Sequence, residues 1–202
     1  MTLYEKRQKF SKLSVRIGTV FSRIGLSPNQ WTIFSLVPVL AAFYFLTQEQ
    51  FLWAGVFFII SAFLDMVDGA VARVTGRVTK QGAYLDTIVD RYIEGIIVFG
   101  LLFANLPVFM FPAYVWIFLY FFGSLMTTYA KAAAKEKGLV EKELKGGLLE
   151  RAERLIILFA GILLAHFDPF YLTSILVVLA LLTNISALER AAIAWRKGTK
   201  SR

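Results

Sequence analysis

The sequence predicts an all-α integral membrane protein in which six transmembrane helices follow an N-terminal amphipathic interfacial helix. Three observations predict this fold. Hydrophobic residues make up 57% of the 202 and charged residues only 18%, and the mean hydropathy is +0.63, far above that of an ordinary soluble domain. Apolar stretches alternate with short polar breaks along the chain. Lys and Arg gather in alternate breaks, as the positive-inside rule requires.

The first 25 residues are too charged for a signal peptide. Their apolar residues recur at helical spacing among lysines and arginines: Phe10, Leu13, Ile17, Val20, Phe21 and Ile24. This pattern is typical of a helix that lies in the membrane interface, although a basic tail that only sets topology is the alternative. We therefore expect a juxtamembrane helix over 1–25 and a six-helix membrane domain over 26–202. Ser27 and Pro28 are suited to the cap and the first position of the first span.

The apolar stretches are centred on 31–46, 51–64, 92–104, 108–129, 155–167 and 169–187. Several are shorter than the roughly 20 residues that a spanning helix needs, but each can extend into its polar flank. The breaks at 47–50, 105–112 and 166–170 contain no Lys or Arg, so both termini are expected on the cytoplasmic side. The net charge of +8 is then mainly a topology signal, and no nucleic-acid partner is needed to explain it.

The stretch DMVDGAVARVTGRVTKQGAYLDTIVD, residues 65–90, contains four aspartates between two apolar segments. Asp65 and Asp68 are three residues apart, and Asp86 and Asp90 are four apart, so each pair shares one face of a helix. A short basic turn near 75–80 joins the two helices and makes them antiparallel neighbours. The four carboxylates are therefore expected to converge near the cytoplasmic side.

Convergence of carboxylates in a membrane protein calls for a neutralising partner, because each aspartate at depth costs about 2.5 to 3.5 kcal/mol. A hard divalent cation supplies that partner. The chain has no cysteine, and oxygen ligands alone favour Mg²⁺, Mn²⁺ or Ca²⁺ over zinc. Four carboxylates are enough for two ions, an arrangement common in phosphoryl transfer.

Small residues flank these aspartates on both predicted helices: Gly69, Ala70, Ala72, Gly82 and Ala83. They leave room for a bulky phosphate ester, but close packing of helices is the better explanation when these small residues are considered alone. Arg73 either binds phosphate or marks the cytoplasmic boundary.

The spacing D-x2-D-G-x2-A-R-x8-G-x3-D-x3-D, from Asp65 to Asp90, resembles the full signature of the CDP-alcohol phosphatidyltransferase family. The resemblance implies a phosphotransferase of phospholipid biosynthesis in a prokaryotic cell membrane, which transfers a phosphatidyl-type group from a CDP-linked lipid to a polar alcohol and releases CMP. It implies that Asp65, Asp68, Asp86 and Asp90 bind two divalent cations, Mg²⁺ or Mn²⁺, and that Asp90 is the general base. It also implies a set of residues that bind the donor nucleotide: Pro28, Asn29, Gln30, Trp31, Gly69, Ala72, Arg73, Thr79 and Gly82.

A second basic cluster lies within 127–155 and at Arg190. Without the family resemblance, its charges are explained as signals that set the membrane topology. Its sequence resembles the branch of the family that makes phosphatidylinositol phosphate and its archaeal counterpart, in which basic side chains hold inositol 1-phosphate. By this resemblance the acceptor phosphate is bound by Lys131, Arg151, Arg154 and Arg190. The chain departs from that branch at 133–135, where Ala-Ala-Lys replaces the usual Arg-Ala-Glu.

Other functions remain open at this stage. The same chemistry can use glycerol 3-phosphate or serine as acceptor, or a CDP-inositol donor, and intramembrane aspartates also occur in divalent cation transporters. No internal repeat of the kind that transporters show is visible in the sequence. A homodimer is expected from the family resemblance alone.

Overall fold

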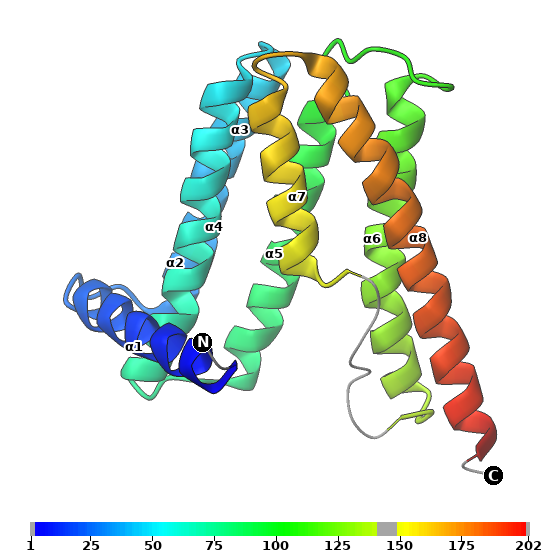
Figure 1. Ribbon diagram of the computed structural model, residues 1–202. Helices are drawn as coiled ribbons and strands as arrows, with labels where there is room; N and C mark the ends of the chain where they lie inside the picture. The colour runs from blue at the N-terminus through cyan, green and yellow to red at the C-terminus, as the bar shows by residue number, and fades with distance from the viewer. Residues whose placement is uncertain (1–2, 141–148, 201–202) are drawn as a thin grey trace. The chain divides into compact units, whose positions relative to one another are not determined.

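The computed structural model describes the backbone of residues 3–140 and 149–200 and the side chains of residues 12–140 and 149–198. These residues form helices joined by short turns (Figure 1), and no strand is found among them. The helices are α1 (Leu3–Ser22), α2 (Pro28–Phe34), α3 (Leu36–Thr47), α4 (Phe51–Val74), α5 (Lys80–Leu101), α6 (Ala113–Glu136), α7 (Arg151–Leu164) and α8 (Pro169–Lys200). The predicted all-α class is confirmed.

Four helical segments of the described chain are long and apolar enough to cross a membrane: residues 28–47, 51–74, 113–136 and 169–198. The segment 28–47 combines α2 and α3. Two predicted spans fall short of this standard for different reasons. Helix α5 carries a series of charged side chains in its first four turns, and α7 has only 14 residues, about 21 Å of helix. The count of six spans therefore stays a prediction.

The chain forms two compact units. The first contains residues 1–45 and 53–97, and so includes α1, α2 and most of α3, α4 and α5. The second contains residues 46–52 and 98–202, and includes α6, α7 and α8. Each unit has its own group of polar residues.

Helix α2 begins as the sequence predicts. The Ser27 hydroxyl accepts a hydrogen bond from the backbone N–H of Gln30, and the Gln30 side chain accepts one from the backbone N–H of Ser27 at 2.8 Å. Pro28 occupies the first turn, where its missing N–H costs nothing. This reciprocal capping fixes the point at which the chain enters the helix.

Helix α1 packs against α4 within the first unit. A Cβ on Gly18 would collide with the backbone carbonyl oxygen of Ala70, so only glycine permits this approach. Ile17 and Phe21 pack against the buried cluster of Trp31, Val67 and Val71 on α2 and α4.

A helix, α1, thus occupies most of the segment 1–25, and the apolar residues of this segment divide between two surroundings. Ile17 and Phe21 pack inside the unit, whereas Leu13, Val20 and Ile24 are between 50% and 60% exposed. The side chain of Phe10, which the sequence places on the same face, lies outside the described residues. Burial of this helix in the membrane interface stays a prediction.

Helices α6 and α8 lie side by side in the second unit (Figure 1). Gly123 permits their close contact, because a Cβ there would lie 2.5 Å from Thr183 Oγ1 and 2.8 Å from the backbone nitrogen of Asn184. The Asn184 side chain donates to the carbonyl oxygens of Leu119 and Ala180, both at 2.8 Å. A partly buried polar side chain thus ties α8 to α6 where the backbones meet.

Candidate metal and nucleotide site

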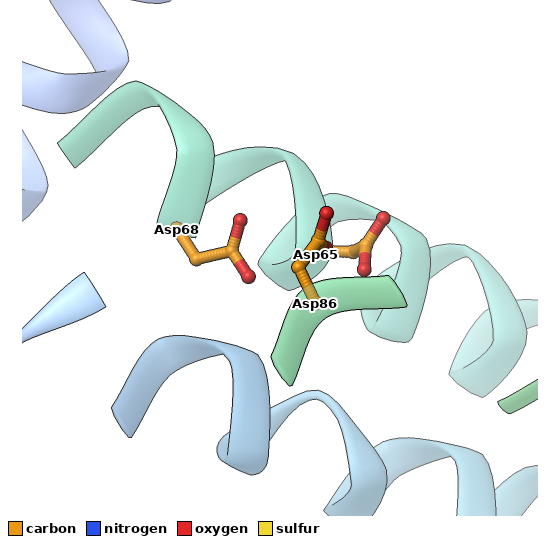
Figure 2. Close-up of side chains that lie close together, drawn as sticks. All are labelled: Asp65, Asp68 and Asp86. Atoms are coloured by element: carbon orange, nitrogen blue, oxygen red, sulfur yellow. The ribbon is translucent and has the colours of Figure 1, made fainter. Parts of the chain in front are cut away.

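Three of the four predicted metal ligands come together in the first unit. Asp65 and Asp68 on α4 and Asp86 on α5 each offer a carboxylate oxygen, and these oxygens lie within 4.8 Å of one another. Figure 2 shows the three side chains gathered between the two helices. The basic turn predicted between them spans the residues between Val74 and Lys80. Both the shared helix face and the antiparallel turn follow from the spacing in the sequence.

The donor chemistry of this group fits a hard divalent cation. All three side chains are carboxylates, and Asp68 is buried to 6% exposure while the other two are partly buried. Carboxylates crowded in this way repel one another unless a cation shares them. Asp90 is not a member of this three-residue group; it follows Asp86 by one turn of α5.

A cavity of about 320 Å³ lies beside the carboxylates in the same unit. It is lined by Asp68 and Asp86 and by seven of the nine residues predicted to bind the donor nucleotide: Pro28, Asn29, Gly69, Ala72, Arg73, Thr79 and Gly82. The sequence places these seven residues in three separate segments, and folding brings them to one hollow next to the metal group.

Close approach of side chains explains both glycines of the cavity. The Arg73 guanidinium lies over Gly69, where a Cβ would be 3.2 Å from Nη1, and its Nη2 donates to Ser14 Oγ on α1 at 2.9 Å. A Cβ on Gly82 would lie 3.1 Å from Asn29 Oδ1 and 3.1 Å from Thr79 Oγ1. Added side chains at either position would fill the space that borders the cavity.

Thr79 also caps α5. Its hydroxyl oxygen accepts the backbone N–H of Gly82 at 3.0 Å, which satisfies one of the N–H groups at the start of the helix. The N-terminal end of α5, with its partial positive charge, therefore borders the cavity. An anionic ligand would be favoured there.

The other two predicted donor residues do not line the cavity. The Gln30 side chain caps α2 through Ser27, and Trp31 is 7% exposed and packs edge-on against Phe21 of α1, with ring centres 5.4 Å apart. Both residues support the segment that carries Pro28 and Asn29.

Several residues of the cavity wall are not predicted by the sequence pattern, above all Thr32 and Arg77. Thr32 is 3% exposed and its hydroxyl donates to Asp68 Oδ2. The only signal in the sequence was its place one turn after Pro28 on the predicted helix. Arg77 belongs to the basic turn, whose positive charge the positive-inside rule explains without a ligand.

The predicted acceptor residues lie in the second unit, where Thr127 connects two of them. Arg154 and Arg190 are 1% and 3% exposed. Arg154 Nη1 donates to Thr127 Oγ1 and Arg190 Nη1 donates to the Thr127 carbonyl oxygen, each at 3.1 Å. Helices α6, α7 and α8 thus each contribute one residue to a buried polar cluster.

Glu150 connects the basic residues a second time. Its two carboxylate oxygens lie 3.3 Å from Arg190 Nη2 and 3.4 Å from Lys131 Nζ. Glu150 itself is half exposed and directly precedes Arg151, the first residue of α7. The carboxylate therefore bridges two of the four side chains that the sequence assigns to the acceptor phosphate.

Arg91 and Glu94, for which the sequence offered no role, form an ion pair on α5 at 2.9 Å. Glu94 is 1% exposed, so the pair neutralises a carboxylate deep in the unit, one turn beyond Asp90.

Long apolar helices together with three clustered carboxylates suited to a divalent cation are the features of a membrane protein with a candidate metal site. The comparison with protein families makes the class specific. Residues 26–186 match the family model of the CDP-alcohol phosphatidyltransferases, and the chain belongs to this family. It is accordingly a transferase of phospholipid biosynthesis.

The chain is also similar to individual members. It is 38% identical over 154 residues to an archaetidylinositol phosphate synthase of Pyrococcus horikoshii, covering 76% of this chain and 78% of that protein. It is 33% identical over 164 residues to a phosphatidylinositol phosphate synthase of Mycobacteroides abscessus, covering 77% of this chain and 70% of that protein.

Solved structures of the Mycobacterium tuberculosis phosphatidylinositol phosphate synthase resemble this fold. The structure with CDP-DAG bound has a TM-score of 0.80 at 28% identity, over 91% of this chain and 94% of that one. The structure with manganese and citrate also has a TM-score of 0.80, at 29% identity, over 90% and 88% of the two chains.

Proposed function

We propose that this enzyme transfers the phosphatidyl-type group of a CDP-linked lipid to a hydroxyl of inositol 1-phosphate and releases CMP. The observation that carries the proposal is that one unit contains three clustered carboxylates beside a cavity of about 320 Å³, while the other unit contains buried arginines. An acceptor that already bears a phosphate explains why buried guanidinium groups are needed. The relatives named above, which make phosphatidylinositol phosphate or archaetidylinositol phosphate, support the same acceptor.

Two divalent cations, Mg²⁺ or Mn²⁺, would be held by Asp65, Asp68 and Asp86, with Asp90 reaching the second. A bound metal supplies positive charge that polarises the phosphoryl group and stabilises the leaving CMP. The crystallised relative with manganese supports this choice of metal.

The protein's own groups then have separate tasks. The cavity residues, with Arg73 and the N-terminal end of α5, hold the pyrophosphate and cytidine of the donor. Asp90 accepts the proton of the acceptor hydroxyl while that oxygen attacks the phosphorus of the phosphatidyl group. The bond from this phosphorus to the CMP oxygen breaks, and CMP leaves with the bonding electrons. A carboxylate is a sufficient base because the hydroxyl becomes acidic only as the new bond forms.

Lys131, Arg151, Arg154 and Arg190 would bind the acceptor's phosphate. Guanidinium groups suit this task because they offer paired N–H donors at the geometry of phosphate oxygens. The Glu150 carboxylate is half exposed and pairs with Lys131 and Arg190. A phosphate carries more negative charge, so it can replace this carboxylate.

The membrane arrangement is part of the proposal. Helices α2–α3, α4, α5, α6, α7 and α8 would make six spans, α1 would lie in the interface, and the active site and both termini would face the cytoplasm. The exposed Leu13 and Val20 of α1, and Ile24 just after it, suit contact with lipid. The juxtamembrane helix at 1–25, the membrane domain at 26–202 and a homodimer complete this proposal.

A comparison of three acceptor alcohols tests the proposal. Purified full-length protein receives Mg²⁺ or Mn²⁺, a CDP-linked lipid with ester or ether chains, and one of three acceptors: inositol 1-phosphate, glycerol 3-phosphate or serine. CMP release is expected with inositol 1-phosphate, and Asp65→Asn supplies the background. Faster release with either other acceptor would reject the proposed acceptor. No CMP with any acceptor would favour the transporter alternative.

A further inference from the structure

Thr32 lies between two parts of the site: the Pro28–Asn29 segment of the cavity wall, called here the nucleotide segment, and the metal group of Asp65, Asp68 and Asp86. It is on α2, one turn after Pro28 and Asn29 of the cavity wall, and is 3% exposed. Its hydroxyl donates to Asp68 Oδ2 on α4 and is also 3.2 Å from the Pro28 carbonyl oxygen. The carboxylate is the stronger acceptor, because hydrogen bonds to charged groups are roughly twice as strong as neutral ones.

We infer that Thr32 is a positioning residue that orients the Asp68 carboxylate for metal binding and links the metal to the nucleotide segment. This inference rests on the proposed metal role of Asp68. A carboxylate has lone pairs to spare on both oxygens, so one hydrogen bond from a threonine leaves capacity for a cation. Such a bond fixes the rotation of the side chain before the metal arrives. Outer partners of metal ligands act in this way in many metalloproteins.

A second buried contact also holds the end of α2 against α4. It allows the positioning role of Thr32 to be distinguished from helix packing. Ser61 Oγ on α4 donates to the Ser35 carbonyl oxygen at 2.8 Å, and Ser35 Oγ donates to the Thr32 carbonyl oxygen at 2.6 Å. Ser35 and Ser61 are both 0% exposed. Ser61 and Asp68 are seven residues apart, about two turns along one face of α4. The helices are thus joined at two points, and only one of them touches a predicted metal ligand.

The two contact points offer a matched experiment. Thr32→Val keeps the shape of the side chain and removes the hydroxyl, Thr32→Ser keeps the hydroxyl, and Ser61→Ala removes the other contact. Mn²⁺ binding to the purified full-length variants is followed by the paramagnetic resonance signal of free Mn²⁺, with and without CMP. Thermal unfolding without metal reports whether each variant is folded.

Thr32→Val is expected to weaken Mn²⁺ binding about tenfold, within the range for outer partners of metal ligands, and to reduce the gain in Mn²⁺ affinity that CMP confers. Thr32→Ser should restore most of the affinity. Ser61→Ala should lower the unfolding temperature and leave Mn²⁺ affinity unchanged. If Thr32→Val does not fold, the smaller Thr32→Ala takes its place in the same comparison.

Unchanged Mn²⁺ affinity in the valine variant, when Asp68→Asn loses binding, would overturn the inference and leave the metal site intact. Equal loss in Thr32→Val and Ser61→Ala would also overturn it, because a packing role would then be sufficient. If Asp68→Asn itself binds Mn²⁺ normally, the proposed metal role of Asp68 is wrong and the inference falls with it.

Discussion

Glu150→Gln tests whether the acceptor site is held by an internal anion until the substrate arrives. The Glu150 carboxylate lies 3.3 Å from Arg190 and 3.4 Å from Lys131, two residues proposed to bind the acceptor's phosphate. The phosphate must therefore displace the carboxylate. A neutral amide of the same shape removes that competition, and the apparent KM for inositol 1-phosphate is expected to fall.

The exposure of the partners sets the size of the effect. Glu150 is 50% exposed and Lys131 is 27% exposed, so water screens the ion pairs and each contributes only about 0.2 to 1 kcal/mol. Arg190 is buried, at 3% exposure, so the stabilisation by its ion pair is expected to exceed the lower limit of that range. We expect a gain of about 0.4 to 1 kcal/mol, which corresponds to a roughly two- to fivefold lower KM.

The assay is CMP release at saturating donor and varied inositol 1-phosphate. Glu136→Gln is the matched control, because Glu136 pairs with Lys137 at 3.1 Å in the same unit and both side chains are 71% exposed. The control should leave KM and kcat unchanged. Glu150→Gln should lower KM with kcat within about twofold of the original enzyme, since the transition state gains no interaction that the ground state lacks.

A KM that rises in Glu150→Gln would refute the competition. It would mean that the carboxylate holds Lys131 and Arg190 in the geometry that the acceptor needs. An unchanged KM would equally refute it, by removing Glu150 from the path of the phosphate.

Two further variants test the base and the helix packing. Asp90→Asn is expected to lower kcat by about 10² to 10⁴ with donor binding retained, as loss of a general base does; CMP release and CMP binding measure the two effects, and near-normal turnover would reject the assignment. Gly123→Ala should cost about 1 to 3 kcal/mol through overpacking of α6 against α8, seen as a lower unfolding temperature. Gly161→Ala, whose new Cβ would meet only side-chain atoms of Ile175 and Leu172 at 3.1 Å or more, should cost less, and equal losses would contradict this account.

The metal group could be predicted from the sequence because its residues lie on two consecutive helices joined by one short turn. The spacings from Asp65 to Asp68 and from Asp86 to Asp90, with a short turn between, are enough to predict two facing helix edges. Most of the cavity wall was identified through the family resemblance, which assigns residues by position. Helix boundaries near Ser27 and Pro28 followed from capping chemistry.

The remaining contacts join residues far apart in the sequence. Thr32 and Asp68 are 36 residues apart, and Thr127 and Arg190 are 63 apart. No periodicity or spacing rule connects such pairs, because they depend on how the helices pack. Gln30 and Trp31 show the same limit: position in the motif suggested nucleotide contact, whereas their side chains cap α2 and pack against α1.

The contact of Gly18 with Ala70 shows that α1 belongs to the structural unit that contains the cavity. The match to the family model begins at residue 26, after the end of α1, yet α1 belongs to the same compact unit as the cavity. Ala70 is two residues from Asp68, and Ser14 of α1 holds the guanidinium of Arg73. The start of the family-model match at residue 26 therefore falls inside a structural unit, and α1 is the helix that holds Arg73, a residue of the cavity wall, in place.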